Sequence, residues 1–427
     1  MRVNPPQPKS PQPPFCKGGC SGGNDGDGLH AQPPFEKGGR RGDFGAFALL
    51  LALCCATASA SEPAWRTSWD GTLYGYANST AVRGDSVLNP GNRVAGLAQR
   101  SEVAELRLNF KAENEDVRLT GRAIASTREL RNAFDSQQRG EAYLSQWQLR
   151  TRVAEGWNLA AGREVLNWGP AQFRSPSSPF YFDNGRSDPM RELTGMDALK
   201  LSWTPDMQSS ASLARIVRSG DRSTETDPWR ASWLVKFDRR GDEWAYGLVA
   251  LKAPDQPGFY GAHGQITLSD ALLLYGELGS SSMAQASSPR RTTALAGTSY
   301  TFEDGHSLAA EYLHEGHGYN AAQEDAYFQR ALTSPDRAPE LAPRLLGRDY
   351  LHLVWQSNLM DDQGYWRVMA TRNLTDGGNE IAAYGERALG HDISGFLLAV
   401  LPQGNARQEF SALLQRSVTL GLKIALP

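Results

Sequence analysis

The chain has 427 residues, a formal net charge of -3 and 40% hydrophobic residues. A soluble protein of this length is expected to divide into two or more domains, whereas a large membrane barrel can place the whole chain in one closed sheet. No apolar run reaches the roughly 20 residues that a transmembrane helix needs, and the near-neutral charge argues against a nucleic-acid partner. A transmembrane barrel is compatible with this composition because its lipid-facing and lumen-facing residues alternate and average out.

The N-terminal region has the order of features of an export signal. Lys37, Arg40 and Arg41 precede a short apolar stretch that ends in small residues. We therefore predict that residues 44–60 are the hydrophobic and cleavage region of a signal peptide that is cut after Ala60. The apolar stretch is too short to act as a membrane-spanning anchor.

This cleavage would divide the chain into a leader and a mature protein. Residues 1–43 are Pro/Gly-rich and of low complexity, so we expect them to form no core and to be absent from the mature protein. Residues 61–427 are predicted to form the barrel. All four cysteines precede this region, which excludes a disulfide framework and a Cys-ligated zinc site from the folded part. They are Cys16, Cys20, Cys54 and Cys55.

The dominant period of the mature region is two residues. Across 104–112, apolar residues alternate with Glu105, Arg107, Asn109 and Lys111. Such alternation places one face of a strand in an apolar medium and the other in water. About 18 segments of this kind are predicted, most of them close to the roughly 9–11 residues that a tilted transmembrane strand needs. They begin near residues 67, 102, 117, 141, 157, 197, 209, 229, 243, 258, 271, 291, 307, 348, 364, 379, 392 and 417.

The predicted connections alternate between long and short. Short turns at 113–116 and 154–156 follow long loops at 80–101 and 127–140, and the loop 167–196 is longer still. Short periplasmic turns and long extracellular loops are typical of outer-membrane barrels. We therefore predict an all-β fold, a transmembrane antiparallel β-barrel of about 18 strands, within a range of 14–18. The main soluble alternative is a periplasmic β-rich binding domain.

Three segments carry a family resemblance. The sequence Gly-Arg-Glu-Val-Leu-Asn-Trp-Gly-Pro at 162–170 is similar to the Gly-Arg-Gln-x-x-x-Trp-Gly segment of bacterial outer-membrane porin-like barrels, of which the alginate-export-type group is one example. Residues 197–205 resemble the strand after the large loop of such proteins, and 417–424 resembles their closing strand. The Trp-Gly-Pro element is also similar to capsule-assembly barrels.

The resemblance implies a place in the outer membrane of a Gram-negative bacterium. The expected partners are outer-membrane lipid and lipopolysaccharide, the barrel assembly machinery that recognises a closing strand, and a small-molecule or saccharide solute. The oligomeric state is left open.

Catalysis finds little support in the sequence. The predicted mature region, residues 61–427, contains no Gly-x-Ser-x-Gly elbow and no His-Glu-x-x-His motif. His306, His314 and His317 come with Glu311 and Glu315 in a pattern that suggests a metal site, but eight residues of strand separate His306 from His314 by about 26 Å. His314, Glu315 and His317 could still meet at a strand–loop junction, where the alternative is a polar rim. Glu192 and Asp197 are loop-edge carboxylates without an identifiable partner. We expect no enzyme, no metal and no cofactor.

Charged side chains on the water-facing side of the strands would line the lumen. Rings of Lys and Arg favour anions, so we predict a preference for anionic or sugar-acid solutes. The alternative is that these charges pair across the lumen and hold the wall. The predicted inward residues are Arg107, Lys111, Arg118, Arg122, Arg150, Arg152, Arg230, Lys236, Arg367 and Glu311, together with Glu105 and Glu277.

The loop 167–196 is the predicted constriction. Its prolines stiffen the backbone, its arginines can bind carboxylates through forked donors, and its aromatic side chains could face sugar rings. The residues expected to act there are Arg174, Phe180, Tyr181, Arg186 and Arg191. The alternative is a cover on the outer rim.

Two functions are compatible with these features. The first is a porin or export channel that passes small polar solutes by passive diffusion. The second is a barrel for the assembly or binding of surface polysaccharide, with no open pore.

Overall fold

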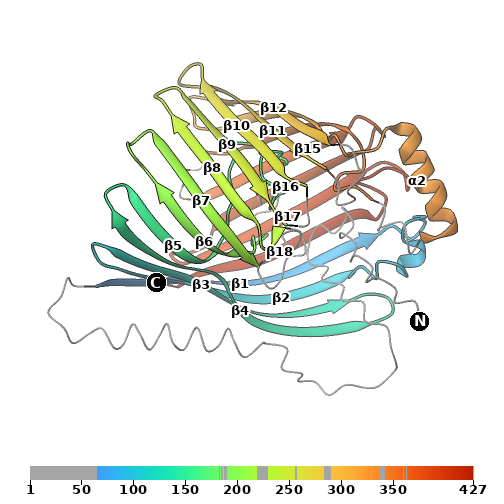
Figure 1. Cartoon of the computed structure of the whole chain (residues 1–427). Helices are drawn as coiled ribbons and strands as arrows, with labels where there is room; N and C mark the ends of the chain where they lie inside the picture. Colours follow the sequence, from blue (N-terminus) through green and yellow to red (C-terminus); the bar gives the residue numbers. More distant parts are fainter. Residues whose placement is uncertain are drawn as a thin grey trace, which may run out of the picture.

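A computed structural model of the chain forms one closed barrel of 18 antiparallel strands (Figure 1). The structure describes residues 65–426 apart from 182, 184–185, 187–189, 219–228, 255–256, 283–289, 336–341, 359 and 362. The predicted leader, signal peptide and cysteines lie outside the described residues, as does Pro427 at the chain's end.

The strands follow one another around the barrel in chain order. Their bounds are β1 (Arg66–Val82), β2 (Arg100–Glu113), β3 (Val117–Arg131), β4 (Ser136–Ala154), β5 (Trp157–Glu164), β6 (Met196–Trp203), β7 (Ser209–Arg218), β8 (Trp233–Arg240), β9 (Trp244–Lys252), β10 (Phe259–Thr267), β11 (Leu272–Ser281), β12 (Arg291–Thr301), β13 (Ser307–His314), β14 (Asp349–Gln356), β15 (Gly364–Asn373), β16 (Asn379–Ala388), β17 (Ile393–Gln403) and β18 (Leu414–Leu426).

The barrel closes between its first and last strands. The β1–β18 ladder runs from Gly71 opposite Leu426 to Val82 opposite Leu414. Closure joins the first strand to the last, so the described sheet has no terminal strand, which suits a membrane because lipid offers no partners to the backbone groups of an open sheet edge. The predicted antiparallel barrel of about 18 strands is therefore confirmed.

The alternation of each strand produces two different walls. Leu397 and Leu420 are direct cross-strand partners whose side chains are 46% and 64% exposed on the outside of the barrel. Phe396 precedes Leu397 in β17, so its side chain points to the inside of the barrel. There it contacts Tyr76 of β1, with the two ring centroids 6.2 Å apart. Among the described residues, no helix is long and apolar enough to cross a membrane.

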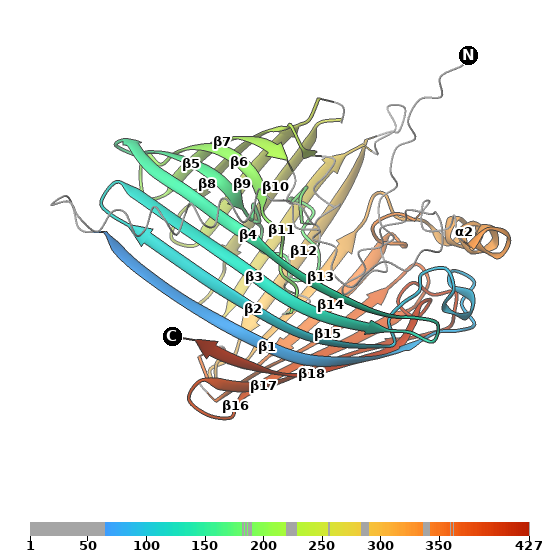
Figure 2. The same ribbon diagram turned by 90° about the horizontal axis from the view of Figure 1, so that it is seen from below.

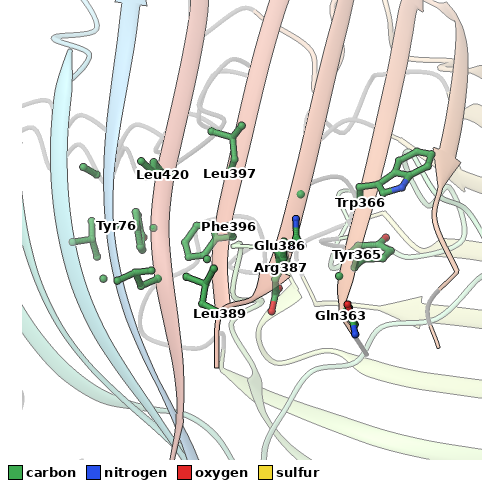
Figure 3. A pocket seen from close by; sticks show the side chains of 18 of the residues that line it. Tyr76, Gln363, Tyr365, Trp366, Glu386, Arg387, Leu389, Phe396, Leu397 and Leu420 are labelled. Atoms are coloured by element: carbon green, nitrogen blue, oxygen red, sulfur yellow. The ribbon is translucent and has the colours of Figure 1, made fainter. Parts of the chain in front are cut away.

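The outer wall has a hollow over β15–β18 and β1–β3 (Figure 3). Leu397, Leu420 and Trp366 line it, and the ladders place all three on the same face, because Gly385 pairs with both Leu397 and Trp366. Most of its lining therefore belongs to the lipid-facing side, so this hollow is separate from the interior of the barrel.

Two segments differ from their predicted form. Residues 127–131 pair with 136–140, so β3 and β4 extend into the expected loop and leave a tight connection. The strand expected from residue 229 begins at Trp233, because Ala231 has a φ of 56° and interrupts the extended chain. Trp229 instead packs against Phe259 and donates to the Pro179 carbonyl at 3.0 Å.

One end of the barrel carries most of the long connections and a small apolar core of its own (Figures 1 and 2). Helix α2 (Ala321–Thr333) lies in the β13–β14 loop and packs against the β1–β2 loop, which contains the short helix η1 (Pro90–Asn92), and against the β17–β18 loop. Asn320 and Gln323 form a capping box at the start of α2, which satisfies two of its free backbone donors.

Candidate functional site

The described part of the loop 165–195, which joins β5 to β6, lies inside the barrel. It is anchored by two inward carboxylates on the opposite wall, Glu277 of β11 and Glu311 of β13. Glu277 accepts hydrogen bonds from the backbone N–H of Ala171 at 2.8 Å and from the Ser175 hydroxyl at 2.6 Å. An irregular segment inside a protein needs such partners because its backbone groups have no ladder to join.

Glu311 holds the adjoining part of the loop. Its carboxylate accepts from the N–H groups of Gln172 at 2.6 Å and Phe173 at 2.8 Å, and from the Tyr275 hydroxyl at 2.8 Å. Both anchoring carboxylates are almost fully buried. A buried carboxylate is tolerated only when it is well hydrogen-bonded, so loop and wall satisfy each other.

The sequence motif at 162–170 explains why the loop turns inward. Arg163 pairs with Asp197 at 2.8 Å and so joins β5 to β6 at the base of the loop. The Trp168 indole donates to the Ser177 carbonyl at 2.9 Å and closes a turn. Gly169 has a φ of 91°, which favours glycine, and a Cβ there would overlap the Glu277 carboxylate.

Glycines on the wall allow the loop to approach closely. A Cβ on Gly279 of β11 would overlap the Pro176 carbonyl, and one on Gly261 of β10 would lie 2.7 Å from the Ser177 carbonyl. The backbone of the loop therefore lies directly on the backbone of the wall.

The predicted aromatic residues of the loop are buried. Phe180 is 0% exposed and Tyr181 is 1% exposed, and both pack with Met196, Ile216 and Leu234. Their rings therefore have no face open to a solute, and the expectation that they would face sugar rings was wrong. Their contribution is apolar packing, which holds the loop against β6–β8.

The arginines of the loop make contacts within it. Arg174 and Arg191 both pair with Asp183, at 2.6 and 3.1 Å. Arg186 donates to the carbonyls of Pro170 at 2.6 Å and Ala171 at 2.7 Å. Fixed donors and acceptors of this kind stiffen a segment that has no regular secondary structure.

The returning part of the loop reaches the wall of β2 and β3. Glu192 lies between Arg107, whose Nη1 is 3.2 Å from Glu192 Oε2, and Arg122, whose Nη1 is 3.1 Å from Oε1. Arg107 also donates to the Met190 carbonyl at 3.2 Å. The loop therefore spans the interior from β2–β3 to β11–β13.

The other predicted inward side chains lie on the interior face, with one exception. Arg230 is exposed in the segment before β8, so the strand position from which its inward orientation was predicted was wrong. Lys236 pairs with Asp238 and lies 5.7 Å from the Trp168 ring. Arg367 donates to Gln172 Oε1 at 3.1 Å.

A group of cations lies on the interior face of β2–β4, away from the loop. Lys111 and Arg118 share Glu113, at 2.6 and 3.6 Å. Arg118 and Arg150 are direct cross-strand partners, and Arg152 follows Arg150 on the same face. Like charges placed opposite each other are destabilising, so Arg118 and Arg150 repel each other across the ladder.

Sequence reasoning missed several interior groups because their partners are distant in the chain. Lys200 of β6 pairs with Glu164 of β5 at 2.6 Å, although its direct partner in the ladder is Ala160. A cavity of about 530 Å³ lies between the loop and β7–β10. Arg186, Asp238 and His263 are among its lining residues.

The histidines near β13 have separate surroundings. His314 pairs with Asp349 at 2.8 Å, and His306 pairs with Asp304 at 3.1 Å. Within the part of the chain that the structure describes, no three His, Cys, Asp or Glu residues form a group that could hold a metal ion.

Solved structures of Pseudomonas aeruginosa proteins resemble this barrel. The structure of OccK11 (OpdR) matches with a TM-score of 0.54 and 12% identity, covering 84% of this chain and 96% of the other. OccK5 (OpdH) matches with a TM-score of 0.54 and 10% identity, covering 84% and 98%. The outer membrane protein OprD matches with a TM-score of 0.52 and 12% identity, covering 86% and 96%. No family model and no curated protein matches the sequence.

The chain has the fold of these outer-membrane barrels. Its lipid-facing wall agrees with that fold, since exposed apolar residues stand outward on its strands, such as Leu274 on β11 and Leu353 and Trp355 on β14. A closed barrel with an apolar exterior is the form in which strands cross the outer membrane of Gram-negative bacteria. The protein is therefore a transmembrane barrel of that membrane.

Proposed function

We propose that this barrel is a porin, a passive channel for small polar solutes with a preference for anionic or sugar-acid solutes. The observation that carries the proposal is the loop 165–195, which is held inside the barrel from Arg107 and Arg122 to Glu277 and Glu311. A pore needs a polar lumen, a constriction and a field. The loop narrows the interior, and the charged inner wall supplies the field.

The preference for anions rests on the cations of β2–β4. Arg118 and Arg150 face each other with side chains that water can reach, and Lys111 lies nearby on the same face. An anion that passes this wall relieves their mutual repulsion. The resemblance of 162–170 to alginate-export-type barrels supports a saccharide or sugar-acid solute. Lipopolysaccharide and the barrel assembly machinery are the partners that such a protein would meet.

The test is single-channel recording of the purified, refolded protein in a planar lipid bilayer. We expect stable conductance steps. Under a KCl gradient, we expect the reversal potential to be shifted from zero toward the equilibrium potential of chloride. Clear cation preference would contradict the anionic part of the proposal. If no current appeared and the protein bound purified polysaccharide, the alternative function, a surface-polysaccharide assembly or binding barrel, would replace the channel.

A further inference from the structure

Glu192 joins the inward loop to two arginines of the wall. Its side chain is 15% exposed, and its two oxygens pair with Arg107 at 3.2 Å and Arg122 at 3.1 Å. Ser145 Oγ and Gln146 Nε2 each lie 3.5 Å from Oε1. The carboxylate is therefore surrounded by donors from β2, β3 and β4.

The two arginines differ in how much solvent they meet. Arg107 is only 13% exposed, pairs also with Glu105 at 2.6 Å, and lies 4.6 Å from the centroid of the Tyr74 ring. Arg122 is 36% exposed, and its Nε donates to Asn109 Oδ1 at 2.8 Å. A passing ion can therefore approach Arg122, whereas Arg107 is enclosed by the protein.

Formal charges at this level of the barrel cancel. Glu105 and Glu192 carry two negative charges, and Arg107 and Arg122 carry two positive charges. An ion in the lumen therefore meets a nearly neutral wall here, although the strands themselves contribute basic residues. Exposed charges act over a screening length of about 8–10 Å in physiological salt. Loss of one of these four charges would therefore change the electrostatic potential for an ion that passes the loop.

We propose that Glu192 is a specificity-determining residue, which masks Arg122 and so limits the preference of the channel for anions. The inference rests on the proposed channel function and concerns the same site. Arg122 becomes an uncompensated cation beside the constriction when Glu192 loses its charge. The amide of Glu192→Gln keeps an acceptor for the arginines, and the anchors at Glu277 and Glu311 still hold the loop.

The experiment compares reversal potentials of the wild type and variants under a KCl gradient. Glu192→Gln is expected to raise the chloride-to-potassium permeability ratio about two-fold or more, with little change in unit conductance. The matched control is Glu164→Gln, which removes another inward carboxylate that is paired with a cation, Lys200. It is expected to change the ratio less, since the cation that it leaves uncompensated, Lys200, is 22% exposed, whereas Arg122 is 36% exposed.

A double variant separates charge from loop position. Glu192→Gln combined with Arg122→Gln restores neutrality, so its permeability ratio should return close to that of the wild type. Persistence of the shift in the double variant, or equal shifts in Glu192→Gln and Glu164→Gln, would overturn the inference. If the wild type conducts and Glu192→Gln has the same permeability ratio as the wild type, the inference about Glu192 is overturned, while the proposed channel function stands. A wild type without any conductance would instead refute the proposed function.

Discussion

At the scale of single residues, the position of the inner loop 165–195 depends on glycines of the wall as much as on charged side chains. Gly279 faces the interior from β11, and a Cβ there would overlap the Pro176 carbonyl. The nearby Glu277 accepts hydrogen bonds from Ser175 and Ser177 on either side of that proline. Glycine and carboxylate together allow backbone to lie on backbone.

We predict that Gly279→Val displaces the loop from the wall. The added side chain has no space, and overpacking of this kind typically costs about 1–3 kcal/mol. Because the strands pair independently of the loop, the cost should be met by moving the loop and not by opening the barrel. Single-channel conductance and its fluctuations should both increase.

Gly75→Val is the matched control for this prediction. Gly75 lies on the outward face of β1, opposite Leu422, and a Cβ there would meet no atom within 4 Å. The control should conduct like the wild type. If both variants conducted alike, close packing of Pro176 on β11 would not determine the position of the loop.

At the scale of elements, helix α2 is docked through a group of carboxyls. Glu324 of α2 is 5% exposed and faces Asp376 of the β15–β16 loop, Glu409 of the β17–β18 loop and the Asn373 amide. Asp325, next to it on the helix, adds another negative charge. Burial, followed by the charges of Asp376 and Glu409, raises the pKa of Glu324 to about 8.

We predict that docking of α2 weakens as the pH rises. The ordinary pKa of a glutamate is 4.5, so the docked helix holds a proton between pH 4.5 and about 8 that the undocked helix releases. Docking of α2 is therefore most stable below pH 4.5, and its stability falls as the pH rises from 4.5 to about 8. Hydrogen exchange of the α2 amides should be several-fold faster at pH 9 than at pH 6, after correction for intrinsic exchange.

Glu324→Gln tests the origin of this pH dependence. The amide cannot ionise, so exchange in α2 should stay slow at both pH values. Gln329 is exposed on the same helix, and Gln329→Glu adds a carboxylate at the surface as a control that should retain the wild-type dependence. Equal pH dependence in the wild type and Glu324→Gln would show that another group controls docking.

At the scale of the whole molecule, the barrel was predictable and the path of the inner loop was not. The alternation of apolar and polar residues is a local pattern, so it predicted the first residues of β3, β5 and β13 correctly. The loop has no period, and its anchors are distant in sequence: Ala171 and Glu277 are 106 positions apart. Partners of that kind follow only from closure of the barrel.

The candidate site was predicted unevenly for the same reason. The inward orientation of Arg107 and Arg122 followed from alternation, but their shared partner Glu192 stood in a segment without regular structure. Arg230 was misplaced because the alternating pattern continued through Trp229 and Ala231 while the backbone did not. Phe180 and Tyr181 were assigned to the loop, but sequence could not distinguish packing from exposure to solute.

Because the strand ladders close the barrel without the loop 165–195, we predict that most of this loop can be removed without loss of the folded barrel. Glu164 and Met196, which flank the loop, are direct partners in the β5–β6 ladder, so a short connection can replace residues 171–190. Halving or doubling a loop changes the free energy of its closure by only about 0.6 kcal/mol. After the deletion, Glu277 and Glu311 would face lumen water and not a dry interface, so neither would be left buried without a partner.

This deletion variant should keep the gel mobility of a folded barrel in unheated detergent samples and conduct more than the wild type. The double variant Glu277→Gln, Glu311→Gln keeps the bulk of the loop but weakens its anchors, so its conductance should be intermediate and noisier. Unchanged conductance in a folded deletion variant would mean that the loop does not constrict the path. Loss of the folded form would mean that the loop supports the wall, contrary to the independence of the strand ladders.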